Sequence, residues 1–192
     1  MKRHDRQYTR LPDYDYSKDG AYFVTVCTKN RVQSLARIEN GKAILSKVGL
    51  IVHALWPAVI GEIEGIEMDE FVIMPNHMHG IIHVRRGLIN QTPTTANSRS
   101  SWILMQNPSL TLGKIVRYSK AKATRIIRKN GFEDFAWQRN YHDRIIRNEE
   151  ELNATRQYIL NNPMKWEFDR ENSLSVNYDV DHDIYFKNIL CR

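Results

Sequence analysis

The stretch EFVIMPNHMHGIIHV, residues 70–84, restricts the fold more than any other part of the chain. Two apolar segments flank a Pro-Asn pair, and this pattern is typical of two strands joined by a turn. Because the connection is short, segments 66–74 and 78–85 are predicted to pair as an antiparallel hairpin. The fold must therefore contain an antiparallel sheet. One of its strands begins with two histidines, His77 and His79.

The composition is that of a soluble globular protein. The 192 residues are 42% hydrophobic and 26% charged, which suffices for one domain with a core and a small extension. No apolar run approaches the roughly 18 residues of a membrane span, and the first residues lack the apolar segment of a secretory signal. Cys27 and Cys191 form neither a disulfide framework nor a metal motif, and Cys27 is expected to be a small buried residue. We therefore expect a cytoplasmic protein without a membrane partner.

Four further segments carry secondary-structure signals. Their residue types and periodicity predict a strand at 21–28, a helix at 41–60 that ends at Pro57, a helix at 111–130 and a strand at 135–146. Thr111 is a suitable cap for the second helix, and Gly131 is suited to end it. Residues 87–101 are polar with little apolar periodicity, so they are predicted to form a loop.

The segment 148–163 carries both start and stop signals of a helix. Asn148 is a good N-cap, and Glu151 stands three residues later, as in a capping box. Proline disfavours helical geometry in the residue before it, so Asn162-Pro163 ends the helix.

The order of elements defines the expected fold class. Strand, helix, strand, strand, helix, strand matches the β-α-β-β-α-β split unit. We predict an α+β, ferredoxin-like protein with one antiparallel sheet, helices on one face, and a further C-terminal helix. The sequence shows no internal repeat and no domain boundary. Residues 164–192 have scattered aromatic side chains in polar surroundings and indicate no function.

The histidine pair indicates either a metal site or two hydrogen-bonded structural histidines. Residues two apart in a strand share one face, with Cβ atoms roughly 7 Å apart, so the imidazoles of His77 and His79 are able to converge on one ion. His83 lies roughly 13 Å further along the strand, too far to join them. No His-Glu-X-X-His motif is present, which disfavours a zinc-protease helix.

The last predicted helix places Tyr158 and Asn162 on one face. They are four residues apart, about 40° around the helix. Leu152 and Ile159 mark the adjoining apolar side, so Tyr158 is expected at the border of the buried face. From pattern alone it is either a tyrosine that faces a cleft or an ordinary border residue.

The helix predicted at 111–130 has a strongly basic polar side. It has seven cations and no acidic residue: Lys114, Arg117, Lys120, Lys122, Arg125, Arg128 and Lys129. The whole chain has a formal charge of +6. Such a helix is either a solvated surface or an electrostatic footprint for phosphates.

Three motifs together resemble a known family. MPNHMHGIIHV, WQRNYHDRIIRNEEEL and YILNNP occur in the order found in REP-associated tyrosine transposases, a branch of the single-tyrosine HUH transposases of insertion-sequence type. GAYFVTVCTKNR also resembles the first strand of that family. The resemblance spans about residues 8–166. It implies a transposase domain at 1–166 and a C-terminal extension at 167–192.

The resemblance implies an enzyme that cleaves and rejoins single-stranded DNA at sites flanked by hairpins. His77, His79 and Asn162 would bind a divalent metal, Mg²⁺ or Mn²⁺, although several relatives have Gln at the position of Asn162. Tyr158 would attack phosphorus and form a 5′-phosphotyrosine, leaving a free 3′-hydroxyl on the DNA. The general base is not identified. Some relatives build each site from two chains, so a homodimer is possible.

Beside a nuclease-like site, the basic helix is interpreted as a DNA-binding surface, which Arg139 and Arg144 extend. Tyr158 is preferred over Tyr141 as the nucleophile because Tyr141 falls at the end of a predicted strand. Tyr118 is interpreted as a stacking or packing residue. Trp102 and Trp137 are candidates for stacking on unpaired bases, with packing as the alternative.

Two other functions stay open. A domesticated relative would bind DNA or RNA hairpins on the same fold without cleaving them. A metal-dependent phosphodiesterase would use water and form no covalent adduct. The predicted strand DEFVIMPN lacks the aromatic pattern of RNA-recognition modules, which disfavours that class of binder.

Overall fold

The computed structural model describes residues 15–16, 18–85, 110–169 and 172. Its main sheet has four antiparallel strands in the order β4-β5-β1-β6. These strands are β1 (Gly20–Cys27), β4 (Ile66–Ile73), β5 (His77–Val84) and β6 (His142–Ile146). The predicted α+β class and β-α-β-β-α-β order are confirmed. The predicted loop at 87–101 lies outside the described residues.

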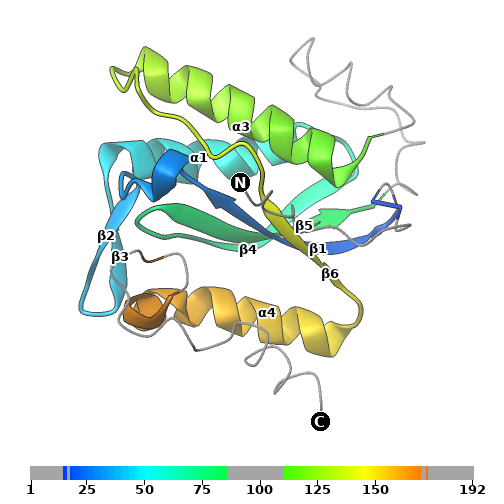
Figure 1. The fold of residues 1–192 in the computed structure, drawn as a ribbon. Helices are drawn as coiled ribbons and strands as arrows, with labels where there is room; N and C mark the ends of the chain where they lie inside the picture. Colours follow the sequence, from blue (N-terminus) through cyan, green and yellow to red (C-terminus); the bar gives the residue numbers. More distant parts are fainter. Residues whose placement is uncertain (1–14, 17, 86–109, 170–171, 173–192) are drawn as a thin grey trace, which may run out of the picture.

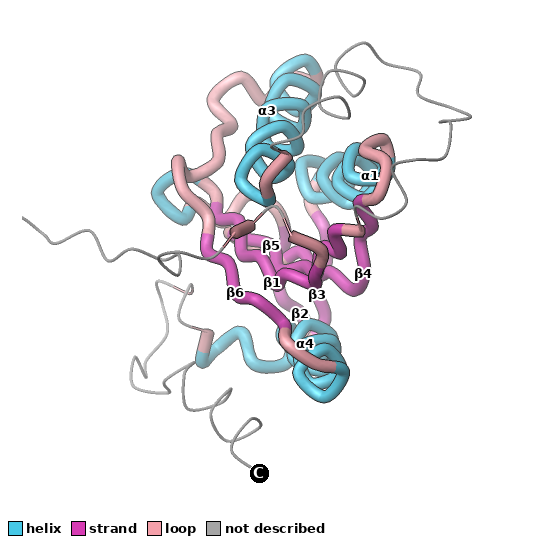
Figure 2. The backbone as a smooth tube through the Cα atoms, turned by 90° about the vertical axis from the view of Figure 1, so that its right-hand side faces the viewer, coloured by secondary structure: helices cyan, strands magenta, loops and turns pink. Residues whose placement is uncertain are grey.

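Helices cover both faces of this sheet (Figures 1 and 2). Helices α1 (Lys47–Gly61) and α3 (Leu112–Lys129) pack on one face, as predicted. Helix α4 (Glu149–Asn161) covers the other face. The two central strands are therefore buried on both sides. No helix among the described residues has the length and apolarity to span a membrane.

Strand alternation separates two apolar clusters. Met78, Ile82 and Val84 of β5 join the larger cluster beneath α1 and α3. Ile81 joins the smaller cluster beneath α4, together with Phe23 of β1. His77 and His79 have the same parity as Ile81, so they lie on the α4 face of the sheet.

Residues 42–45 form a strand and not the start of a helix, so that prediction is wrong. Strands β2 (Ala36–Glu39) and β3 (Lys42–Leu45) pair as a hairpin. Asn40 and Gly41 connect them with φ values of 50° and 71°. An Asn-Gly pair with both residues left-handed forms the two-residue hairpin turn that fits strand twist best. This local signal outweighed the apolar periodicity of the region.

Helix α1 starts at Lys47 and continues past Pro57, which was predicted to end it. Ser46 caps the start, because its side chain accepts a hydrogen bond of 3.0 Å from the Gly49 amide. Pro57 lies inside the helix, followed by the buried Val59 and Ile60. Burial of these side chains offsets the missing amide donor of proline.

The strand predicted at 135–146 is shorter than expected. Only residues 142–146 belong to the sheet, and Trp137 forms an isolated bridge with Thr28. Phe135 and Trp137 are buried in the core beneath α1, where the Trp137 ring lies 5.7 Å from that of Trp56. Packing of these aromatic rings therefore replaces strand pairing over the first part of the segment.

Helix α4 begins and ends where the sequence predicts. The Asn148 side chain accepts a hydrogen bond of 2.8 Å from the Glu151 amide, and the Glu151 carboxylate accepts one of 2.9 Å from the Arg147 amide. The α-helix ends at Asn161, and a 3₁₀ segment, η3 (Asn162–Phe168), follows with Pro163 in its first turn. Cys27 is buried, as predicted.

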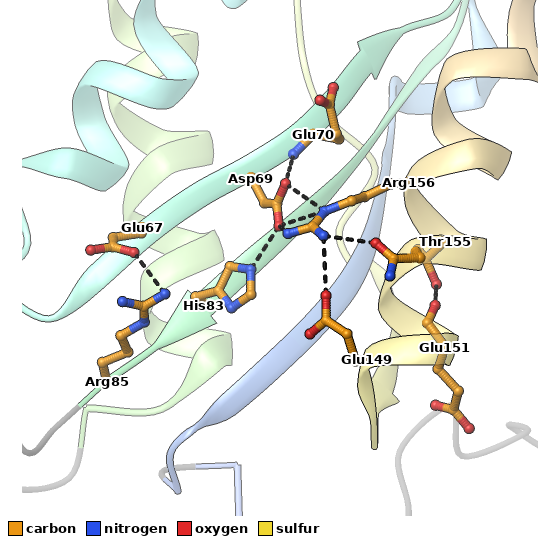
Figure 3. A network of polar contacts seen from close by, with 10 residues as sticks. Glu67, Asp69, Glu70, His83, Arg85, Glu149, Glu151, Thr155 and Arg156 are labelled. Carbon is orange, nitrogen blue, oxygen red and sulfur yellow. Dashed lines mark hydrogen bonds and ion pairs between the residues drawn. The ribbon is translucent and has the colours of Figure 1, made fainter.

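An ion pair attaches α4 to the sheet (Figure 3). The Arg156 guanidinium donates to the Asp69 carboxylate over 2.7 Å, and the His83 ring lies 2.8 Å from the same carboxylate. Burial by itself would raise the pKa of Asp69. Hydrogen bonds from Arg156 and His83 outweigh it and lower the pKa from 3.8 to about 2.

The lowered pKa predicts a pH-dependent contribution to stability. The ionised Asp69 stabilises the fold by about 2 kcal/mol above the pKa of the unfolded carboxyl group, and this is lost as pH falls through the folded value. The free energy of unfolding should therefore differ between wild type and Asp69→Asn at about pH 6, and the difference should shrink towards about pH 2.5. Urea denaturation across this range measures it. A difference that is constant with pH contradicts the prediction.

Two glycines of α1 predict opposite effects of one substitution. A Cβ on Gly49 would lie 2.0 Å from the Leu35 carbonyl oxygen, whereas a Cβ on Gly61 meets nothing within 4 Å. Gly49→Ala should destabilise the fold by about 1–3 kcal/mol, because the backbone must move. Gly61→Ala should be neutral or stabilise it by up to about 1 kcal/mol, because alanine favours the helix. Thermal unfolding of both variants tests the two predictions. Equal shifts in melting temperature would contradict them.

Candidate active site

The start of β5, directly after its connection to β4, brings the two histidines together. His77 and His79 are 0% and 2% exposed, and their ring centroids lie 4.4 Å apart. Their Nε2 atoms are 3.0 Å from each other. The predicted convergence of the two imidazoles is therefore present in this structure.

Asn76 fixes the tautomer of His77. The Asn76 amide nitrogen donates to the Arg31 carbonyl over 3.3 Å, so its Oδ1 atom faces His77 Nδ1 at 2.9 Å. An amide oxygen only accepts hydrogen bonds, and His77 must therefore carry its proton on Nδ1. In the neutral ring the Nε2 lone pair is left facing His79.

The contact with Thr25 is compatible with either tautomer of His79. The Thr25 hydroxyl lies 2.8 Å from His79 Nδ1, and a hydroxyl both donates and accepts. In one arrangement Thr25 donates to Nδ1, and His79 Nε2–H donates to His77. In the other, His79 Nδ1–H donates to Thr25, and both Nε2 lone pairs face one point. The second arrangement is the one that a cation requires.

The separation of the two Nε2 atoms suits a divalent ion. Two ligands at right angles, each about 2.1 Å from a metal, lie roughly 3.0 Å apart. Asp169 adds a carboxylate, and ligand atoms of His77, His79 and Asp169 all lie within 4.8 Å of one another. Imidazole nitrogen with carboxylate oxygen is a donor set for first-row divalent cations such as Mn²⁺. These three residues can therefore hold a metal ion.

Asp169 was missed by the sequence analysis. It follows η3, is 6% exposed, and places Oδ2 3.8 Å from His77 Nε2. The Asp169 amide donates to the Trp166 carbonyl, and the Trp166 ring centroid lies 6.0 Å from that of His77. The sequence gives no periodic or motif signal at this position. Its proximity to the histidines comes from the tertiary path of the chain after α4.

Asn162, the oxygen ligand implied by the family resemblance, is also buried. It is 3% exposed, and its Oδ1 atom has no hydrogen-bond partner among the described residues. A buried amide oxygen without a partner is costly, and a bound cation would satisfy it. This observation fits the expected role of Asn162, and the role stays a prediction.

Tyr158 lies against the histidine pair. Its ring centroid is 5.5 Å from that of His79 and 5.8 Å from that of Phe23. The residue is 6% exposed, so it is buried and not at the border of the helix face. Tyr141 and Tyr118 instead pack against the cluster on the α1 and α3 face. Of these three tyrosines, Tyr158 alone joins the apolar cluster beneath α4.

Helix α3, which carries the basic residues, lies on the face of the sheet opposite α4 (Figure 1). Arg117, Arg125, Arg128, Lys129 and, beyond the helix, Arg139 are exposed, and Lys114 is half-buried. This exposed set is free of acidic neighbours within the helix. DNA that contacts both α3 and the histidine pair must therefore pass around the edge of the sheet.

Several of the predicted DNA-binding cations have structural contacts. Lys120 donates to the carbonyls of Arg139 and Asn140, both at 3.2 Å, and burial lowers the pKa of its ammonium group. Lys122 forms an ion pair with Glu62. Lys120 thus holds the chain that leads into β6, and Lys122 ties α3 to the end of α1.

Trp137 is packed rather than presented for stacking. It is 8% exposed, and its ring lies edge-on to Phe135 at 5.0 Å. The packing alternative therefore describes this residue. Trp102, the other candidate for base stacking, lies outside the described residues.

This sheet and its helices have the same fold as a protein of known structure. A solved structure of a REP-associated tyrosine transposase bound to a REP hairpin is 22% identical to this chain, with a TM-score of 0.50. The match covers 81% of this chain and 73% of the transposase. At this identity the likeness shows the shared fold.

The chain belongs to the same family as an uncharacterized protein of Haemophilus influenzae. The two are 37% identical over 167 residues, which are 87% of this chain and 93% of the relative. No family model matches the sequence.

The geometry around His79 predicts a role for Thr25 in metal affinity. We expect Thr25→Val to bind Mn²⁺ about 10-fold to 100-fold more weakly, because the His79 Nδ1–H of the metal-binding tautomer loses its acceptor. Thr25→Ser keeps the hydroxyl and should bind like wild type. Titration followed by Mn²⁺ electron paramagnetic resonance measures both. Equal affinity of the valine and serine variants is the contrary outcome.

Proposed function

We propose that the protein is a metal-dependent transposase that nicks and rejoins single-stranded DNA through Tyr158. The observation that carries this proposal is the contact between Tyr158 and His79, at 5.5 Å between ring centroids, beside two Nε2 atoms 3.0 Å apart. A phenol next to a potential cation site is the arrangement that a covalent phosphoryl transfer requires.

The proposed reaction exchanges one phosphodiester for another. The Tyr158 oxygen attacks the scissile phosphorus while its proton passes to a base. The bond from phosphorus to the 3′-oxygen breaks, and that oxygen takes up a proton from the base or from water, which leaves a 3′-hydroxyl and a 5′-phosphotyrosine. Attack by a different 3′-hydroxyl reverses the step and joins two strands, so no external energy source is needed.

The metal-holding residues in this proposal are His77, His79, Asp169 and Asn162. A bound divalent ion, Mg²⁺ or Mn²⁺, supplies positive charge that offsets the charge on the transferring phosphoryl group. Asn76 and Thr25 orient the two rings, as described above. Phe23 lies edge-on to the Tyr158 ring and limits its tilt.

Entry of DNA requires movement of the segment after α4. His77, His79 and Tyr158 are all buried, and Trp166 and Asp169 lie against His77. Because the proposed ligands Asn162 and Asp169 belong to this segment, the movement that admits a phosphate must keep them beside the histidines. The proposed enzyme therefore has a closed form, which this structure represents, and an open form that admits the strand.

The proposed partner is single-stranded DNA with a hairpin. One structural neighbour is a transposase bound to a REP hairpin, and this chain shares its fold. The exposed cations of α3 would contact phosphates of the duplex stem. All four proposed metal ligands and Tyr158 come from one chain, so a homodimer is not needed to complete the site. A substrate of this kind is consistent with the expected cytoplasmic location.

A second candidate function is hairpin binding without cleavage. The burial of Tyr158, at 6% exposed, favours it, because a nucleophile must reach its substrate. The same fold and the same basic helix would serve a binder equally well.

Covalent adduct formation tests the proposed reaction. Incubation with Mn²⁺ and single-stranded hairpin DNA from the flanking genome should yield a protein–DNA adduct on a denaturing gel. Tyr158→Phe should abolish the adduct, and chelation with EDTA should do the same, because nucleophile or metal is then absent. Tyr141→Phe is the matched control and should keep the adduct.

The other outcomes separate the alternatives. Tight binding with no cleavage supports the non-catalytic hairpin binder. Cleaved DNA without an adduct supports a phosphodiesterase that uses water. An adduct that survives in Tyr158→Phe and disappears in Tyr141→Phe would transfer the nucleophile role to Tyr141.

A further inference from the structure

Asp69 collects hydrogen bonds from two different elements (Figure 3). Arg156 of α4 approaches it through Nη2 at 2.7 Å and through Nε at 3.1 Å to the same oxygen. His83 of β5 lies 2.8 Å from that carboxylate, and the Glu70 amide donates to it over 2.7 Å. We call Asp69, His83 and Arg156 the Asp69 clamp.

Asp69 lies in a β-bulge of β4. Met68 pairs with Ile82 and Phe71 with Gly80, so Asp69 and Glu70 both stand opposite a single residue of β5. An extra residue shifts the alternation of the strand. Met68 and Phe71, three apart, both pack towards α1 and α3, and Asp69 is left facing α4.

The clamp connects the two elements that carry the proposed chemistry. His83 is on the strand that begins with His77 and His79, and Arg156 precedes Tyr158 by two residues on α4. Asp69 bonds to both at once. A rotation or slide of α4 that moved the Tyr158 ring from His79 would break the Arg156 contacts.

We propose that the Asp69 clamp positions the nucleophile helix relative to the metal-binding strand. Asp69, His83 and Arg156 are then positioning residues, acting through the placement of Tyr158 and not by contact with the DNA. This inference rests on the proposed function. It gives a role to His83, which lies too far along β5 to bind the metal.

The geometry favours positioning over a surface ion pair of little effect. The Asp69 side chain is 16% exposed, and it receives the fork of Arg156 through two nitrogens, whereas isolated exposed pairs contribute little. Arg156 also contacts Asn153 at 3.0 Å and Glu149 at 3.5 Å. These contacts hold the guanidinium in place and leave it poorly placed to bind phosphate.

Precise placement matters for the proposed step. A displacement of about 1 Å between reacting groups costs up to 100-fold in rate. The apolar cluster beneath α4 contributes Leu152, Tyr158 and Ile159 from the helix, and apolar contacts alone do not fix register. The directional bonds of the clamp supply the missing constraint.

The experiment compares Asp69→Asn and Arg156→Lys with Glu67→Gln. Glu67 lies on the same strand and pairs with Arg85 at 3.3 Å, but it takes no part in the clamp. Arg156→Lys keeps the positive charge but loses the contact of two guanidinium nitrogens with Asp69. Three quantities are measured on the full chain: the rate of Tyr158 adduct formation at saturating hairpin DNA and Mn²⁺, Mn²⁺ affinity, and amide hydrogen exchange of residues 155–161.

We expect both clamp variants to bind Mn²⁺ within about twofold of wild type and to form the adduct at least about 10-fold more slowly. Exchange across residues 155–161 should be about 10-fold faster in both, because local opening of α4 costs less. Glu67→Gln should match wild type in all three measurements. An Arg156→Lys variant as slow as Asp69→Asn identifies the fork, rather than the charge, as the requirement.

Two results would overturn the proposed role of the Asp69 clamp and leave the proposed function intact. One is an adduct rate like that of wild type in both variants, whatever the exchange, since the clamp would then be merely structural. The other is a parallel loss of Mn²⁺ affinity, which would mean general disruption of the site. A wild-type chain that forms no adduct on any hairpin overturns the proposed function, and with it any purpose of the clamp in catalysis.

Discussion

The pairing of β1 with β5 is the constraint on which the site depends. Its register sets Thr25 opposite His79 and Cys27 opposite His77, on the face that α4 covers. Because that face is buried, both imidazoles need polar partners, and Thr25 and Asn76 supply them through the Nδ1 atoms. The Nε2 atoms are then left to face one another. A slip of one residue in this register would turn the pair towards α1 and α3.

The sheet, α3 and α4 could be predicted because their signals are local. Alternating apolar residues around the Pro-Asn turn specify the hairpin, and Asn148 with Glu151 specifies the start of α4. The histidine pair was predictable for the same reason, since residues two apart in a strand must share a face. That Tyr158 faces them was expected only through the family resemblance, and the structure brings its ring beside His79.

The other features of the fold and of the candidate site depend on contacts that no short stretch of sequence specifies. Pro57 is tolerated inside α1 because the following turn is buried in the core. Asp69 contacts Arg156 and His83 at a bulge of β4, and no local pattern of the strand indicates these contacts. Asp169 approaches His77 along an irregular path after η3. The Asn40-Gly41 turn is different, because its signal is local and strong, and helical periodicity nearby obscured it.

The Asn40-Gly41 turn reaches beyond its own hairpin. An atom added at the Cα of Gly41 would meet the Met164 side chain at 3.1 Å, so the tip of the hairpin rests on η3. Met164 lies between Asn162 and Trp166, in the segment that covers the histidines. The β2–β3 hairpin therefore supports the η3 segment against the histidines. A longer turn between β2 and β3 would displace η3 and so change the surroundings of the buried imidazoles, although the turn contacts neither of them.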